Sequence, residues 1–355
     1  MPVNERLRVL VVDDSAFMRG AISRVLAADP RFEIAGQAKD GEEAVKLAAE
    51  LRPDVISMDF NMPGLNGAEA TRAILAKHAT PIVMLSAHTR EGAAATVQAL
   101  AAGAVDFVEK PDGEVSANLN AIRDQLVEKL LSAAGANVRG SMTQVEMGPS
   151  EAPVSRRAPR SPQKAMPAGL RVVVIASSTG GPAALFRVLP ELASLGKAAV
   201  VVVQHMSAGF TSALAEQLAE RAGFGISEAK SGDALEAGRA LVAPGGLHLV
   251  LERDGTVSVN EGPPVHGVRP AADVTLKSAA QVYGARSVGV VLTGMGRDGA
   301  LGLAAIKAAG GRTFAQDKAT CTVYGMPKAA VELGVVDEVL PLDQIGRSVS
   351  RLVSS

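Results

Sequence analysis

Five residues in the first half of this 355-residue chain could together carry out phosphoryl chemistry, and each lies where a short apolar run ends: Asp13, Asp14, Asp59, Ser86 and Lys110. Because the carboxyl ends of parallel strands share one edge of a sheet, we expect these side chains to meet there. Clustered carboxylates repel one another unless a hard cation neutralises them, and oxygen ligands suit Mg²⁺. A solvated loop position or a helix cap would explain any one of these residues, but the five together favour a site. The pattern predicts that a carboxylate beside Mg²⁺ attacks a phosphoryl group, while Lys110 and Ser86 hold the transferred oxygens.

A second group consists of a serine, a histidine and an aspartate in the other half of the chain. A β-branched run leads to Ser178, after which two glycines permit a sharp turn and Pro182 suits the first position of a helix. His205 and Asp298 each follow another apolar run. If these runs are parallel strands, His205 could act as the base for a nucleophilic Ser178, and Asp298 could fix the tautomer of the imidazole. The chain order Ser, His, Asp differs from the order Ser, Asp, His of the α/β-hydrolases.

Two alternatives remain open in this half. His248, which begins an expected strand, is the second candidate for the base. Gly294-x-Gly296-x-x-Gly299 matches a dinucleotide-binding pattern that follows a strand and opens a helix, and Asp317 lies where a ribose-binding acid would. A non-catalytic nucleotide-binding output domain would use these glycines, but it would leave the serine and the first histidine unexplained.

The elements that must position these residues are strands that alternate with helices in both halves. Strands are expected at 8–12, 32–36, 55–58, 82–85 and 106–108, and again at 172–175, 199–203, 247–251 and 288–292. A hairpin is expected over residues 248–260, with its turn at Asp254-Gly255. The alternation predicts an α/β protein with two doubly wound domains whose sheets are mostly parallel.

The two halves are joined by a stretch in which apolar periodicity fades. Five prolines lie between residues 132 and 168, and this composition predicts a flexible to semi-extended linker. We therefore expect one domain at 1–131 and the other at 169–355. A basic cluster in the linker, Arg156, Arg157 and Arg160, could contact an acidic partner, but a solvated linker is the simpler interpretation.

Composition limits the remaining possibilities. The formal net charge of -1, from 36 basic and 37 acidic residues, gives no reason to propose a nucleic-acid or membrane surface. The single cysteine, Cys321, excludes an internal disulfide, fits a reducing compartment, and is expected to be a buried side chain rather than a second nucleophile. No signal-peptide core is present, and no apolar run approaches the ~18 residues of a membrane helix. We expect a cytoplasmic protein that is not membrane-embedded and binds no nucleic acid.

Four motifs occur in order along the first half. They are Val11-Val12-Asp13-Asp14-Ser15, Met58-Asp59-Phe60-Asn61-Met62-Pro63-Gly64, Leu85-Ser86-Ala87 and Glu109-Lys110-Pro111. With these motifs the first half resembles the response-regulator receiver domain over its full length. The resemblance implies a flavodoxin-like (βα)5 fold in which Asp59 accepts a phosphoryl group that a histidine kinase supplies. Asp13 and Asp14 would bind Mg²⁺ together with Asp59 and the backbone carbonyl of Asn61.

The same resemblance implies a switch. Ser86 would be the switch hydroxyl and Lys110 the partner of the phosphoryl group. Phosphorylation adds about -1.5 to -2 charges at Asp59, which is enough to reorganise the contacts of both residues.

Further motifs run through the second half. They are Ser178-Thr179-Gly180-Gly181, Gln204-His205-Met206, Gly209-Phe210-Thr211, Ala243-Pro244-Gly245-Gly246, Arg269-Pro270 with Asp273, Leu292-Thr293-Gly294-Met295-Gly296 with Asp298, and Tyr324-Gly325-Met326-Pro327. With them this half resembles the catalytic domain of the chemotaxis protein-glutamate methylesterases. The resemblance implies Ser178 as nucleophile, His205 as base and Asp298 as its orienting carboxylate. Amides near Thr179 and Met295 would be the oxyanion donors.

The resemblance of the whole chain implies a phosphorylation-regulated hydrolase. Its substrates would be glutamate γ-methyl esters in methylated chemoreceptors, with methanol as a product, glutamine deamidation as a second activity and no cofactor for the esterase reaction. Two segments depart from the family pattern. Ala176-Ser177 stand where the family usually has Gly-Ala, and the register with Thr-Gly-Gly assigns the nucleophile to Ser178. Ser207 stands where proline is frequent, which could loosen the loop after the histidine.

Overall fold

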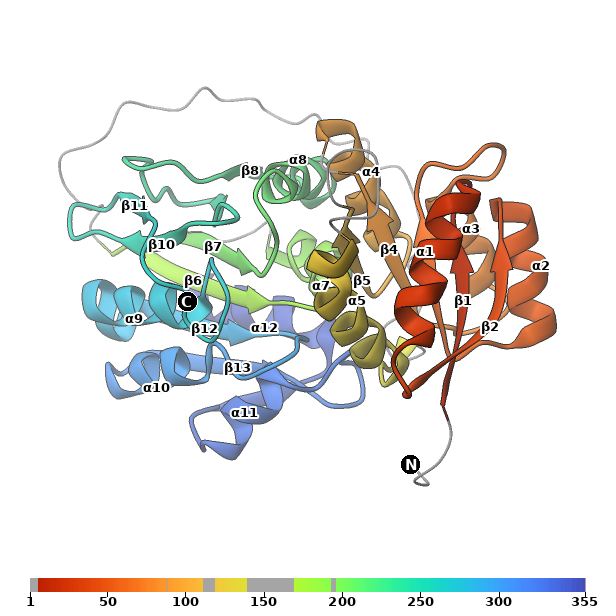
Figure 1. Cartoon of the computed structure of the whole chain (residues 1–355). Helices are drawn as coiled ribbons and strands as arrows, with labels where there is room; N and C mark the ends of the chain where they lie inside the picture. Colours follow the sequence, from red (N-terminus) through yellow and green to blue (C-terminus); the bar gives the residue numbers. More distant parts are fainter. Residues whose placement is uncertain (1–5, 88, 111–118, 139–168, 193–195, 355) are drawn as a thin grey trace. The chain divides into compact units, whose positions relative to one another are not determined.

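The computed structural model describes residues 6–87, 89–110, 119–138, 169–192 and 196–354. The chain divides into two compact units, Met1–Thr143 and Gln144–Ser355 (Figure 1). Helix α5 (Leu119–Ala134) continues three residues beyond the domain end expected at 131. Most of the predicted linker, 139–168, lies outside the described residues. In the described part of the chain, no helix combines the length and the apolar character that a membrane crossing requires.

The first unit is a five-stranded parallel sheet flanked by helices. Its strands are β1 (Leu7–Val12), β2 (Phe32–Ala38), β3 (Val55–Asp59), β4 (Ile82–Ser86) and β5 (Asp106–Glu109), in the order β2-β1-β3-β4-β5. The helices before α5 are α1 (Ala16–Ala27), α2 (Gly41–Leu51), α3 (Gly67–Leu75) and α4 (Arg90–Ala101). Every residue of β3 and β4 is buried, which explains why these strands are continuous apolar runs rather than alternating ones. The predicted doubly wound (βα)5 fold is confirmed.

The helices of this unit begin where side chains cap their free amides. The hydroxyl of Ser15 accepts from the amide of Met18, and the carboxylate of Asp40 accepts from the amide of Glu43. Asn66 and Glu69 form a reciprocal capping box at the start of α3. Such caps stabilise a helix by ~1 kcal/mol each, and they fix where each chain segment leaves the sheet edge.

The second unit contains a seven-stranded sheet in which all neighbouring strands are parallel. Its strands are β6 (Arg171–Ser177), β7 (Ala198–Gln204), β8 (Gly225–Glu228), β9 (Arg239–Val242), β12 (Ser287–Val291), β13 (Arg312–Gln316) and β14 (Glu338–Leu340), in the order β14-β13-β12-β6-β7-β9-β8. The helices are α7 (Gly181–Val188), α8 (Phe210–Ala222), α9 (Ala272–Tyr283), α10 (Ala300–Ala308), α11 (Met326–Glu332) and α12 (Leu342–Ser354), with 3₁₀ turns η1 (Pro190–Leu192) and η2 (Gly284–Arg286). The predicted hairpin is confirmed as β10 (His248–Leu251) paired antiparallel with β11 (Val257–Asn260).

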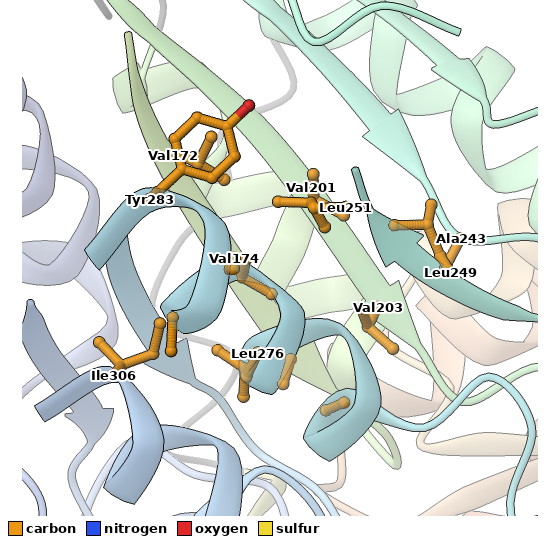
Figure 2. Packing of buried hydrophobic residues seen from close by; sticks show 14 of the residues in the cluster. Val172, Val174, Val201, Val203, Ala243, Leu249, Leu251, Leu276, Tyr283 and Ile306 are labelled. Carbon is orange, nitrogen blue, oxygen red and sulfur yellow. The ribbon is translucent and has the colours of Figure 1, made fainter. Parts of the chain in front are cut away.

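Strand β6 is central, and the core packs on both of its faces. Figure 2 shows Val174 of β6 near Leu276 of α9 and Val172 near Tyr283, and Val201 and Val203 of β7 belong to the same cluster. The alternate residues of both strands are buried on the opposite face, so these strands too are continuous β-branched runs. Burying a side chain such as Leu276 contributes about 1.5 to 3 kcal/mol, and this packing holds α9 in place over the sheet.

Glycines allow α9 and α10 to approach each other and the sheet. A Cβ on Gly302 of α10 would overlap Leu276, and a Cβ on Gly289 of β12 would overlap Leu303. This close packing matters for the site, because Asp298 immediately precedes α10 and lies against the start of α9.

Candidate functional sites

The carboxyl ends of β1 and β3 form an acidic pocket in the first unit. Asp13 follows β1 and Asp59 ends β3; both are buried, whereas Asp14 is exposed. One oxygen from each of the three carboxylates lies within 4.8 Å of the others. Burial, and then the charges of Asp13 and Asp14, raise the pKa of Asp59 to about 6 despite the opposing effect of Lys110. Carboxylate oxygens at this spacing repel one another, and a hard divalent cation bound among them would neutralise their negative charge.

Lys110 reaches into the same pocket. Its Nζ lies 2.8 Å from Oδ2 of Asp13 and 2.9 Å from Oδ1 of Asp59. Burial alone would lower the pKa of Lys110, but the two carboxylates raise it above its usual value. Asn61 lies two residues beyond Asp59 and is exposed to solvent. The structure thus brings together Asp13, Asp14, Asp59 and Lys110 as the sequence predicts.

Ser86 is oriented differently from the sequence-based expectation. Its hydroxyl is buried and contacts the hydroxyl of Thr96 and the carbonyl of Gly92 in α4, with an Oγ–O distance of 3.1 Å to Gly92. The backbone of Ser86 adjoins the pocket, because its carbonyl accepts from the amide of Lys110 at 2.6 Å. In this structure the Ser86 hydroxyl is therefore bonded to α4 rather than directed at Asp59.

The serine turn of the second unit joins β6 to α7. Gly180, the N-cap residue, has a φ of +76°, and a Cβ at this position would overlap Thr322, so only glycine suits the turn. The amide of Ser178 donates to the carbonyl of Thr293 at 3.1 Å, and the carbonyl of Ser178 accepts from the amide of Gly181 at 2.7 Å. The backbone of Ser178 is therefore held on both sides, while its side chain is partly exposed.

Ser177, the neighbouring hydroxyl, has a structural role. It is fully buried, and its Oγ donates to Oε1 of Gln204 at 2.7 Å. The Nε2 of Gln204 in turn donates to the carbonyls of Ser178 and His205, each at 3.0 Å. Gln204 thus ties the turn after β6 to the turn after β7. Sequence reasoning missed this role of Gln204, although a polar residue at the end of a buried strand indicates a hydrogen-bonding role.

His205 and Asp298 meet although 93 positions separate them in the sequence. Nε2 of His205 lies 2.8 Å from Oδ2 of Asp298, and their side chains are 9% and 2% exposed. Asp298 also accepts from the amides of Ala272, Asp273 and Gly299. Burial raises the pKa of Asp298, but the bond to His205, the charge of His205 and the amides of Asp273 and Ala272 lower it, and the net shift is downward. With Nε2 donating to an ionised carboxylate, Nδ1 is the ring nitrogen left to accept a proton.

The loop after β12 lies directly against the serine turn. A Cβ on Gly294 would lie 2.7 Å from Cβ of Ser178. Oγ1 of Thr293 donates to the carbonyl of Thr179 at 3.0 Å and accepts from the amide of Val323 at 2.9 Å. Thr179 is buried, and Met295 in this loop is 40% exposed. The two segments that the sequence proposes as oxyanion donors are therefore adjacent.

The alternatives fit the structure less well. Both ring nitrogens of the buried His248 are occupied, Nε2 by the carbonyl of Pro263 at 3.0 Å and Nδ1 by the amide of Ala271 at 3.2 Å. Asp317 accepts from the amide and hydroxyl of Thr320 in its own turn. Cys321 is buried as expected, and burial raises the pKa of its thiol well above the usual range.

The two sites and their folds define a class of protein: a (βα)5 unit with an acidic pocket, followed by an α/β unit with a serine turn and a His-Asp pair at its sheet edge. Comparison with known proteins agrees with this class. Residues 9–119 match the model of the response regulator receiver domain, and residues 173–349 match that of the CheB methylesterase. The chain belongs to the CheB methylesterase family, in the form that carries an N-terminal receiver domain.

Several relatives are similar over almost their whole length. A protein-glutamate methylesterase/protein-glutamine glutaminase of Symbiobacterium thermophilum is 48% identical over 99% of this chain and 98% of the relative. One from Pyrococcus abyssi is 43% identical over 99% of this chain and 95% of the relative. The crystal structure of the Thermotoga maritima CheB methylesterase catalytic domain is 42% identical, covers 51% of this chain and 98% of that one, and superposes with a TM-score of 0.50.

Proposed function

We propose that this chain hydrolyses glutamate γ-methyl esters and glutamine side-chain amides of methylated chemoreceptors, with Ser178, His205 and Asp298 as its catalytic residues. The observation that carries this proposal is the 2.8 Å contact between His205 and Asp298, formed at the strand edge where Ser178 is held. Relatives of closely similar length carry the name protein-glutamate methylesterase/protein-glutamine glutaminase, which agrees with this chemistry.

The reaction begins when Oγ of Ser178 attacks the ester carbonyl and Nδ1 of His205 takes the hydroxyl proton. Asp298 stabilises the imidazolium that forms, because it remains ionised among its amide donors. His205 then returns the proton to the leaving methoxide, and methanol departs. Water, activated by the same nitrogen, cleaves the acyl-enzyme to glutamate, and an amide substrate would release ammonia in place of methanol.

Amides near Thr179 and Met295 are the proposed oxyanion donors. Support comes from the contact of Gly294 with Ser178 and from the hydrogen bond between Thr293 and the Thr179 carbonyl, which fix the two segments beside the nucleophile. A donor of this kind contributes about 100- to 1000-fold to the rate in comparable sites.

The receiver would regulate this activity through Asp59. Asp13, Asp14, Asp59 and the carbonyl of Asn61 would hold Mg²⁺, which when bound would offset the clustered negative charge and orient a phosphodonor. A histidine kinase would be that donor. Lys110, which already contacts Asp59 at 2.9 Å, would then bind the new phosphoryl oxygens.

The switch would run through Ser86 and α4. To reach a phosphoryl group on Asp59, the Ser86 hydroxyl must leave its contacts with Thr96 and Gly92, so phosphorylation would change the surface of α4. We infer that the unphosphorylated receiver limits access to Ser178 and that phosphorylation relieves the limit. The protein would then act in the cytoplasm, where the kinase and the helical cytoplasmic part of the chemoreceptors are found.

The deciding experiment is methanol release from methylated receptor membranes by the full chain, with and without a small phosphodonor and Mg²⁺. We expect turnover that the phosphodonor increases. No methanol release under either condition would overturn the proposed function.

A further inference from the structure

A second His–Asp pair lies directly behind the proposed catalytic carboxylate. Nε2 of His266 is 2.9 Å from Oδ2 of Asp273. The side chain of Asp273 is 1% exposed, whereas that of His266 is 21% exposed. Neither residue takes part in the hydrolytic steps described above. The amide of Asp273 donates to Oδ1 of Asp298, which links the pair to the proposed catalytic carboxylate.

Asp273 and Asp298 cap each other's helices. The carboxylate of Asp298, which precedes α10, accepts from the first amides of α9, those of Ala272 at 2.6 Å and Asp273 at 2.9 Å. The carboxylate of Asp273, in the first turn of α9, accepts at Oδ1 from the amide of Gly302 in the first turn of α10 at 2.7 Å. The position of Asp298 therefore depends on the first turn of α9, and Asp273 is the side chain that anchors this turn to α10.

This arrangement buries two carboxylates close together. A ring nitrogen of His266 and one oxygen from each of Asp273 and Asp298 all lie within 4.8 Å of one another. Like charges at this separation repel, so each carboxylate needs donors on both oxygens to keep its orientation. Asp298 has His205 and three amides, whereas Oδ2 of Asp273 has the N–H of His266.

The backbone at His266 has an unfavourable conformation that brings the ring to Asp273. His266 and Gly267 have φ values of +54° and +78°. The amides and carbonyls of Val265 and Val268 bond reciprocally at 3.2 and 3.1 Å, which makes this a tight turn with two left-handed central residues. A left-handed non-glycine residue costs free energy, and histidine tolerates it better than most. The contact with Asp273 is the compensating interaction.

We propose that His266 is a positioning residue for the hydrolytic reaction. By holding Asp273 it keeps the first turn of α9 in place, and this turn aligns Asp298 and, through it, His205. Since the Nε2–H donates in both the neutral and the charged ring, the role does not require a particular charge on His266. The inference rests on the proposed catalytic role of Ser178, His205 and Asp298.

The test compares substitutions in the full chain by methanol release. His266→Ala should lower kcat about 10-fold with little change in KM, as loss of an outer hydrogen-bond partner does for other oriented histidines. His266→Asn suits the left-handed turn but is too short to reach Asp273, so it should lose as much activity as His266→Ala. Full activity in His266→Asn would show that only the turn matters and would overturn the proposal.

A double-substitution cycle tests whether His266 affects the reaction through Asp273. If His266 acts through Asp273, then adding His266→Ala to Asp273→Asn should reduce kcat less than 2-fold further. A further 10-fold loss would contradict the route. Lys307→Ala is the control, because Lys307 is the partner of a carboxylate outside this network, Asp337, at 3.2 Å, and its loss should leave kcat unchanged.

A spectroscopic readout separates this inference from the assignment of the triad. In protein labelled with ¹⁵N-histidine, the Nε2–H resonance of His205 reports its bond to Asp298 whether or not the enzyme turns over. We expect His266→Ala to shift or broaden this resonance, while Ser178→Ala leaves it in place. If His266→Ala left both the resonance and kcat unchanged, the positioning role would be wrong even with the triad intact. Retained activity in Ser178→Ala would instead refute the proposed nucleophile.

Discussion

The two sheets of this protein place their reactive residues at the same topological position, where the chain reverses the direction in which strands are added. In the first unit this point lies between β1 and β3; Asp13 follows β1 and Asp59 ends β3. In the second it lies between β6 and β12, which lead to Ser178 and Asp298. Doubly wound sheets bind ligands at such points because the connecting loops diverge there.

The two sites differ in how the protein treats a buried carboxylate. Around Asp59 burial and two further carboxylates outweigh Lys110, and the pKa rises to about 6. Asp298 is also buried, but His205 and the amides of Asp273 and Ala272 reverse the effect, and the pKa falls below its usual value. The first site has negative charge that an incoming cation would offset, whereas the carboxylate of Asp298 is already held by its own hydrogen-bond donors. One topology thus supports two different environments for a buried carboxylate.

The largest expected effect tests the second site. Ser178→Ala should reduce methanol release by on the order of 10⁴-fold or more, because it removes the hydroxyl proposed to form the acyl-enzyme. Ser177→Ala is the matched control, since the two serines are adjacent but the Ser177 hydroxyl, unlike its neighbour's, has a structural bond to Gln204. It should retain activity within about 10-fold and lose about 1 kcal/mol of stability. If Ser177→Ala abolished methanol release and Ser178→Ala retained it, Ser177 would be the nucleophile and Ser178 would not.

Asp298→Asn addresses the electrostatic contrast directly. An amide in place of the carboxylate can donate to Nε2 of His205 and so favour the tautomer that cannot act as base, and kcat should fall by about 10⁴-fold. The same substitution tests acid stability. Because the folded pKa of Asp298 is depressed, its stabilising contribution is present above its ordinary value and is lost as pH falls through the lowered one. The unfolding free energy of wild type should therefore decline over this acid range more steeply than that of Asp298→Asn, and parallel declines would contradict the assigned shift.

Asp59→Ala removes the proposed phospho-acceptor of the first unit and leaves the proposed hydrolytic site of the second unit intact. We expect basal methanol release to persist, while the stimulation by phosphodonor and Mg²⁺, about 5- to 150-fold for typical coupling free energies, disappears. Chelation of Mg²⁺ should abolish stimulation of wild type in the same way. If wild type and Asp59→Ala responded equally to the phosphodonor, the receiver would not regulate this reaction through Asp59.

The smallest effect concerns the glycine turns that present the nucleophile and the base. Gly180 and Gly209 are the N-caps of α7 and α8, with φ of +76° and +86°. Gly209→Ala meets no atom within 4 Å and should cost only the left-handed strain, about 1 to 2 kcal/mol. Gly180→Ala also collides with Thr322 and should cost roughly 2 to 5 kcal/mol. Denaturant unfolding measures both, and equal losses would mean that Thr322 moves away without cost.

Much of this architecture was predictable because it depends on local patterns. Buried parallel strands are continuous β-branched runs, and polar residues at their ends are predicted to share one edge of the sheet. That reasoning placed Asp13, Asp59 and Lys110 in one pocket and paired His205 with Asp298, as the structure shows. Strands β8, β9, β13 and β14 were not predicted, because three to five residues carry too little periodicity to separate a strand from a loop.

The amino-acid sequence by itself determined the two α/β units and which polar residues stand at the ends of their strands, since apolar runs and strand ends are local patterns. Only the tertiary structure decided which hydrogen-bond partners the polar side chains at these strand ends have. The bond of the Ser86 hydroxyl to α4, the link that Gln204 makes between two turns, and the capping of α9 by Asp298 each join residues from separate elements. Such partners are selected by packing and by the need of buried polar groups for hydrogen bonds, which no local pattern encodes.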